Sequence, residues 1–94
     1  MYVFSVNATT PDNFDEFRAG DEVPLMAYVN FKDLTGAELL CKFYIEQEGF
    51  ESVEIDKRKL IAEHFLSNKE LINADPKMKE AIESGYSLQI FSAH

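Results

Sequence analysis

The sequence predicts an α+β fold, a two-layer α/β sandwich formed by a single domain over residues 1–94. Three observations carry this prediction. Apolar and polar residues alternate over residues 25–31, apolar residues recur at helical spacing over residues 35–48, and alternation returns in residues 52–56 and 86–92. Period two is typical of a strand, and a period near 3.6 is typical of an amphipathic helix.

Residues 25–31 form the best-defined predicted strand. Leu25, Ala27, Val29 and Phe31 fall on one face, whereas Met26, Tyr28 and Asn30 fall on the other. Because both faces carry apolar side chains, we expect this strand in the interior of the sheet.

Residues 35–48 form the clearest predicted helix. Thr35 and Glu38 have the spacing of a capping box, which predicts the first turn, and Gly49 followed by Phe50 predicts the end. The inward stripe comprises Ala37, Leu40, Cys41 and Tyr44. Together with the strand 52–56, residues 25–56 predict a strand-helix-strand unit with parallel strands and a right-handed crossover.

The chain before this unit predicts one further strand and one short helix. Residues 2–6 are β-branched and aromatic, which favours a strand. Thr10 and Pro11 have the pattern of a helix start, and Gly20 has the pattern of a helix stop.

After residue 56 the prediction is less uniform. Residues 57–66 fit either a helix or a strand, and we favour a strand that pairs with the preceding one. Residues 67–70 form a second capping-box pattern, which predicts a helix start at Ser67. Asp75 and Pro76 predict that the helix restarts there, and Gly85 predicts its end. The last predicted strand is 86–92, in which Leu88 and Ile90 are expected to be buried. From Leu25 onward the order is therefore strand-helix-strand-strand-helix-strand, which is ferredoxin-like. In this arrangement helices cover one face and leave the other partly open near Tyr28.

Composition limits the function classes. The chain carries 17 acidic residues against 9 Lys and Arg, for a formal charge of -8. Such a charge repels phosphate backbones and anionic lipid surfaces, so we expect neither a nucleic acid nor a membrane as partner. No run of residues approaches a membrane span, the first residues lack the features of a secretory signal, and Cys41 is the single cysteine. We therefore expect a cytoplasmic protein without a disulfide.

No residue pattern indicates catalysis, a metal or a cofactor. Cys41 lies in the inward stripe of its helix and is interpreted as a core residue. His64 and His94 are far apart in sequence, and neither has a Cys or carboxylate at metal-ligand spacing. Lys57, Arg58 and the following lysine are the only basic cluster, and alternation in a strand would separate their side chains. We expect no enzymatic activity, although a site assembled from residues distant in sequence stays open.

The strongest charged segment precedes the first confident strand. It contains Asp12, Asp15, Glu16, Asp21 and Glu22, and it lacks the alternating acids and central glycine of a calcium loop. These five acids, with Tyr28 on the open sheet face, are the candidate partner surface.

The charge motivates the functional hypothesis. The sequence predicts a small acidic interaction or regulatory domain, such as an inhibitor or immunity-type protein that neutralises a basic protein. The partner would be a different basic protein or a second copy of this chain. The alternative is a dimeric domain that binds a small molecule or acts on it, with a tyrosine-lined pocket between sheet and partner subunit.

Overall fold

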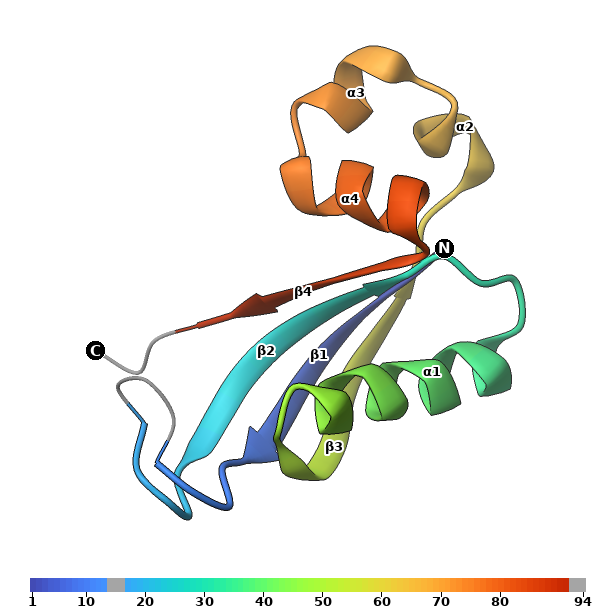
Figure 1. Cartoon of the computed structure of the whole chain (residues 1–94). Coiled ribbons are helices and arrows are strands. Elements are labelled where there is room, and N and C mark those ends of the chain that lie inside the picture. The colour runs from blue at the N-terminus through green and yellow to red at the C-terminus, as the bar shows by residue number, and fades with distance from the viewer. Residues whose placement is uncertain (14–16, 92–94) are drawn as a thin grey trace.

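The protein has an α+β fold with one antiparallel four-stranded sheet (Figure 1). The structure is a computed structural model, and it describes residues 1–13 and 17–91. The elements along the chain are β1 (Tyr2–Thr9), β2 (Glu22–Val29), α1 (Leu34–Gln47), β3 (Glu51–Leu60), α2 (Glu63–Leu66), α3 (Lys69–Asn73), α4 (Pro76–Ser84) and β4 (Tyr86–Ile90).

The strand order is β3-β1-β2-β4, which differs from the ferredoxin-like order expected from the sequence. Strand β1 pairs antiparallel with both β2 and β3, so β2 and β3 run parallel but are separated by β1. Strand β1, which was expected as an additional strand outside the ferredoxin-like unit, is therefore a central strand of the sheet. The physical reason lies in its own side chains, because Val3 and Phe4 point to opposite faces and are both buried.

Residues 57–60 do not form a separate strand. Strand β3 continues through them, because the first residues of β1 offer a partner as far as the Tyr2–Leu60 pair. The chain then leaves the sheet and forms the short helix α2, so the expected strand-strand connection after residue 56 is wrong. The helical region predicted from Ser67 with a restart at Asp75 and Pro76 is confirmed as α3 and α4, and only α2 was not expected.

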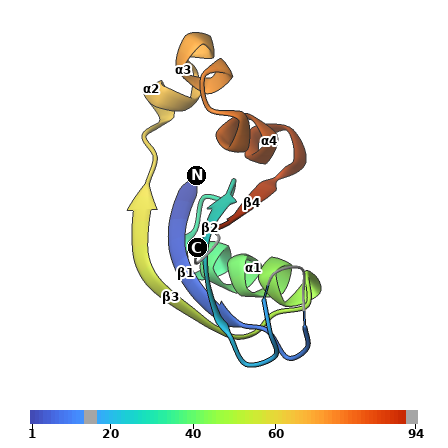
Figure 2. The ribbon, with the colours of Figure 1, turned by 90° about the vertical axis from the view of Figure 1, so that its left-hand side faces the viewer.

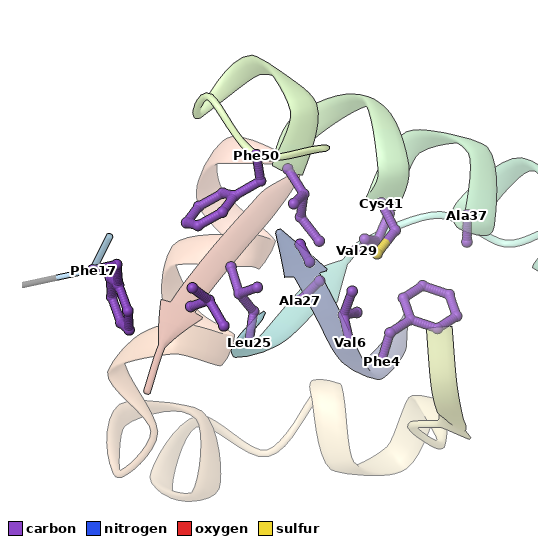
Figure 3. Packing of buried hydrophobic residues seen from close by; sticks show 12 residues of the cluster. Phe4, Val6, Phe17, Leu25, Ala27, Val29, Ala37, Cys41 and Phe50 are labelled. Carbon is purple, nitrogen blue, oxygen red and sulfur yellow. The ribbon is translucent and has the colours of Figure 1, made fainter. Parts of the chain in front are cut away.

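One face of the sheet packs against α1. Phe4, Leu25 and Ala27 from the strands meet Cys41 and Ile45 from the helix, and all five are at most 2% exposed. Figure 3 shows Ala37 and Cys41 projecting from α1 toward the strands. The predicted inward face is confirmed for Leu25, Ala27 and Val29, and Ala37 and Cys41 of the predicted helix stripe are buried as expected. Phe31 does not continue the strand face, because β2 ends at Val29, and it is 43% exposed.

The other face of the sheet is covered at one end by α3 and α4. Val3 and Tyr28, which alternate with the residues facing α1, pack with Ile72, Met78 and Ala81 in a second cluster. Helices therefore lie on both faces, and the expected sandwich with all helices on one face is not what the sheet shows. Figure 1 places α2, α3 and α4 together near the amino terminus of β1, and in Figure 2 the sheet bends toward the side of α1.

The helix ends follow local hydrogen bonding. Helix α1 is capped by Asp33, whose carboxylate accepts from the Gly36 amide at 2.8 Å, and not by the predicted Thr35. Similarly, Asn68 caps α3 in place of Ser67. The predicted cap at Asp75 is confirmed.

The glycine stops also agree with the sequence. Gly49 and Gly85 have φ of 103° and 95°, which is the left-handed region that glycine adopts without strain. Phe50 after the first of these stops is buried against the end of α1, as predicted.

The segment between β1 and β2 is a loop in its described parts, 10–13 and 17–21, where a short helix was expected. Thr10 does not cap a helix, because it is buried and bonds across the loop. Its hydroxyl donates to the Arg18 carbonyl at 2.6 Å, and its carbonyl accepts from the Gly20 amide at 2.6 Å. Residues 14–16, the centre of the predicted helix, lie outside the described residues.

Strand β4 is the edge strand beside β2, and this position changes its predicted burial. Leu88 is half-buried and Ile90 is 39% exposed, although both were expected to be buried. An edge strand has a neighbour on one side only, which leaves its side chains partly open.

The buried face of β1 predicts a large loss of stability on truncation. Phe4→Ala removes a fully buried ring beneath α1 and is expected to lower the free energy of unfolding by about 3–5 kcal/mol. Urea unfolding followed by circular dichroism measures the loss. Phe43→Ala, at a ring that is 52% exposed, is the matched control, and its effect should stay below about 1 kcal/mol. Equal losses in both variants would contradict the described packing.

The environment of Cys41 predicts an unreactive thiol. Burial raises its pKa to about 12, with a further rise from the Glu38 charge that Lys42 opposes. Because the thiolate is the nucleophile, roughly one Cys41 in ten thousand is reactive at pH 8 in the folded state. Iodoacetamide should therefore label the thiol only after unfolding in urea. The variant Ser67→Cys supplies an exposed internal control, and labelling of both thiols at similar rates in the native protein would contradict the buried position.

Candidate functional site

An acidic surface lies at the end of the sheet where β1, β2 and β3 meet the described loop residues 10–13 and 17–21. Cross-strand partners share a sheet face, and the Thr9–Glu22 and Thr9–Glu51 pairs place two glutamates on either side of one threonine. The Asn7–Glu54 pair adds a third glutamate on the same face. All three glutamates are exposed.

Strand β3 is irregular along this surface. Asp56 lies at a register shift between the Ser5–Lys57 and Val6–Ile55 pairs, and its carboxylate accepts a hydrogen bond from the Asn7 side-chain amide. A residue at such a shift has no direct partner on the neighbouring strand. Its side chain can therefore reach a residue of β1 that is not directly opposite. The bond ties the edge strand to the central strand and holds Asp56 beside Glu54.

The loop contributes two further carboxylates. Asp21 is exposed, and one of its oxygens accepts from the Arg18 amide at 2.9 Å. Asp12 is also exposed, next to Asn13, whose side chain accepts from the Ala19 amide at 3.0 Å. We call the surface formed by Glu22, Glu51, Glu54 and Asp56 the acidic end, and Asp12 and Asp21 belong to the loop beside it.

The predicted partner surface is only partly assembled. Glu22 belongs to the acidic end, Asp12 and Asp21 are exposed in the adjoining loop, and Asp15 and Glu16 lie outside the described residues. Tyr28 lies six residues further along β2 than Glu22, about 20 Å away along the strand. It is 7% exposed because α3 and α4 cover it. The expectation that Tyr28 faces an open sheet surface is therefore wrong.

Sequence reasoning missed Glu51, Glu54 and Asp56. They lie thirty or more residues from the acidic segment of the loop, and only the pairing of β3 with β1 brings them beside it. The alternating pattern of residues 51–55 was a usable signal for the outward faces. The choice of neighbour for that strand was not visible in the pattern.

The basic cluster does not converge, as expected for a strand. Arg58 turns toward α1 and forms an ion pair with Glu38. Lys57 and Lys59 pair with Ser5 and Val3, which places them on the opposite face. The partner of Arg58 is thus on the helix and not among the acids of its own strand.

A hollow of about 420 Å³ lies at the other end of the sheet, between the end of β3 and the helices. Its apolar lining comes from Leu60, Ile61, Phe65 and Met78, and its polar lining comes from Lys59, His64 and Asp75. The Asp75 carboxylate accepts from the Met78 amide at 3.1 Å as the cap of α4. Burial, and secondly the Asp75 charge, raise the pKa of the neighbouring Tyr28.

The residues considered for chemistry are separated. Cys41 is fully buried beneath α1, so its assignment to the core is confirmed. His64 is exposed at the hollow, and His94 lies outside the described residues. Within residues 1–13 and 17–91, no three His, Cys, Asp or Glu side chains are grouped as a metal site would require.

No helix in the described part of the chain is both long and apolar enough to cross a membrane. Comparisons with protein-family models, curated proteins and solved structures find no match to this chain.

Proposed function

We propose that this protein is a non-catalytic interaction module whose acidic end binds a basic protein, in the manner of an inhibitor, an immunity-type protein or a regulatory subunit. The observation that carries the proposal is the strand register, which places Glu22 and Glu51 on either side of Thr9. Lys57, which pairs with Ser5 on the same sheet face, is the basic residue that the register places next along β3.

The spacing of these acids suits a protein partner. Glu22 and Glu51 lie two strand spacings apart, which is about 10 Å. This distance is close to the screening length at physiological salt, so their mutual repulsion is modest and the fold tolerates it. A surface with several lysines or arginines at similar spacing would meet all of these carboxylates at once.

The exposure of these carboxylates limits how much each ion pair with a partner can add to the affinity. Single exposed ion pairs contribute little to affinity, in the range of about 0–1 kcal/mol each. A field summed over several carboxylates acts chiefly on the association rate and on partner choice. The proposed role is therefore recognition of a basic surface, with affinity that decreases as salt increases.

A second candidate function rests on the hollow at the helical end. Its volume of about 420 Å³ falls within the range of small-molecule sites, and it combines an apolar lining with two basic side chains, Lys59 and His64, and with the Asp75 carboxylate, one oxygen of which accepts from the Met78 amide. That lining suits a small apolar carboxylic acid. The hollow is formed by β3 and the helices, unlike the predicted tyrosine-lined pocket between subunits.

The acidic end predicts salt-dependent capture of a basic protein. Pull-down from native lysate should retain a basic partner at low ionic strength and release it as salt rises. The triple variant Glu22→Gln, Glu51→Gln, Glu54→Gln is expected to lower the association rate about tenfold.

The control for this experiment changes the net charge equally at other exposed positions. The triple variant Glu63→Gln, Glu70→Gln, Glu83→Gln should retain the partner nearly as well as the unmodified protein. Failure to retain any partner at low salt, or an equal loss in both triple variants, would reject recognition by the acidic end.

The hollow predicts stabilisation by small carboxylic acids. A ligand at one hundred times its dissociation constant adds about 2.7 kcal/mol, which a domain of this size shows as a rise of several degrees in Tm. A thermal-shift screen of aliphatic and aromatic carboxylates measures it. Lys59→Ala should remove the shift, whereas Lys57→Ala, on the same sheet face but outside the hollow, should keep it. A screen without any shift would exclude this second function for the acids tested.

A further inference from the structure

Helix α1 presents apolar side chains to the outside as well as to the core. Leu39 and Phe43 are one turn apart and therefore share a face of the helix. Their exposed fractions are 66% and 52%, and Leu39 is the most exposed large apolar side chain in the described part of the chain. The inward residues of the same helix, such as Cys41 and Ile45, are fully buried.

Aromatic contacts hold this outer surface in place. The Phe31 ring packs onto α1 at Gly36, where an added Cβ would clash with the ring. The Phe43 ring meets Tyr44 edge-on at 5.8 Å, and Tyr44 stacks on Tyr86 of β4 at 3.7 Å. We call the outer surface formed by Phe31, Leu39 and Phe43 the α1 stripe. Exposed apolar surface that is held in place in this way is typical of an interface.

The charges beside the α1 stripe are unevenly distributed along the helix. Lys32 precedes the helix and Lys42 lies in its second half, whereas Glu46 and Glu48 lie at its carboxyl end. The ion pairs within the described residues are Arg58–Glu38 and Lys77–Glu80, so neither of these lysines is paired in the monomer.

A second copy of the same helix, packed antiparallel, complements this distribution. With Leu39 at the centre of the pair, it brings Glu46 of the second copy opposite Lys32 of the first, and a two-fold axis repeats the contact. The opposed helix dipoles also favour this direction. Because Glu51 follows α1 closely, antiparallel packing places the acidic ends of the two copies at opposite ends of the pair, which limits the repulsion from a charge of -8 on each copy.

The open edge of β3 is less suited to self-association. Ser52 has a φ of 51°, and the register of β3 shifts at two places along β1. Exposed charges occur at Glu54, Lys57 and Lys59. Irregular backbone and charged side chains are the features by which edge strands avoid pairing with another chain.

From these observations we propose that the chain forms a reversible homodimer through antiparallel packing of the α1 stripe against the same stripe of a second copy. Helix α1 has 14 residues and is about 21 Å long. A single helix of this length covers less than the roughly 800 Å² per partner of a standard interface, so the dimer is concentration-dependent. This inference is independent of the acidic end, which stays accessible in the pair.

Sedimentation velocity over a range of protein concentrations tests the proposal. The mass of the unmodified protein should rise from that of one chain toward that of two. Leu39→Lys is expected to weaken self-association about tenfold or more, because it places a charge in the apolar centre of the interface. The matched control is Leu71→Lys on α3, at a side chain that is 42% exposed, and it should associate like the unmodified protein. Circular dichroism verifies that both variants are folded.

A charge exchange tests the antiparallel direction. Lys32→Glu and Glu46→Lys should each weaken the dimer, although they change the net charge in opposite directions. The double variant with both changes should recover most of the association, because the two partners of each contact are exchanged together. A monomer at every concentration, an unchanged dimer in Leu39→Lys, or a double variant no stronger than the singles would overturn the proposal. Loss of dimerisation with retained capture of a basic protein separates this inference from the proposed function.

Discussion

The rest of the structure depends on the burial of β1 on both of its faces. Val3 and Phe4 are neighbours in sequence, point in opposite directions and are 7% and 0% exposed. A strand of this kind needs partners at both edges and cover on both faces. The antiparallel pairing with β2 and β3 supplies the edges, α1 covers one face, and α3 and α4 cover part of the other.

Partial cover of the second face decides which residues are available for binding. The helices stop short of the loop end, so Glu22, Glu51 and Glu54 stay in water, while Tyr28 on the same face is enclosed. Carboxylates at the uncovered end require no desolvation in the monomer, and burying them unpaired beneath helices would cost several kcal/mol each. The sheet face is therefore divided into an uncovered polar end and a covered apolar end because the carboxylates stay hydrated and the apolar side chains are buried.

The two proposed contacts use opposite faces of the sheet. The α1 stripe lies on the outer side of the helix that covers one face, and the acidic end belongs to the other face. A homodimer formed through α1 would present two acidic ends, which would strengthen binding to a partner with two basic surfaces through effective concentration. Self-association and recognition of a basic protein are thus compatible in geometry and separable by mutation.

The sequence by itself determined the local features. The faces of the strand 25–31, the buried position of Cys41, the cap at Asp75 and the glycine ends of α1 and α4 depend on side-chain spacing and on hydrogen bonds within a few residues. Tertiary structure alone decided which strand lies beside which, because alternation fixes the faces of a strand but not its neighbours. The central place of β1, the cover over Tyr28 and the approach of Glu51 and Glu54 to Glu22 all follow from that pairing, since hydrogen bonds between distant segments leave no periodic mark in the sequence.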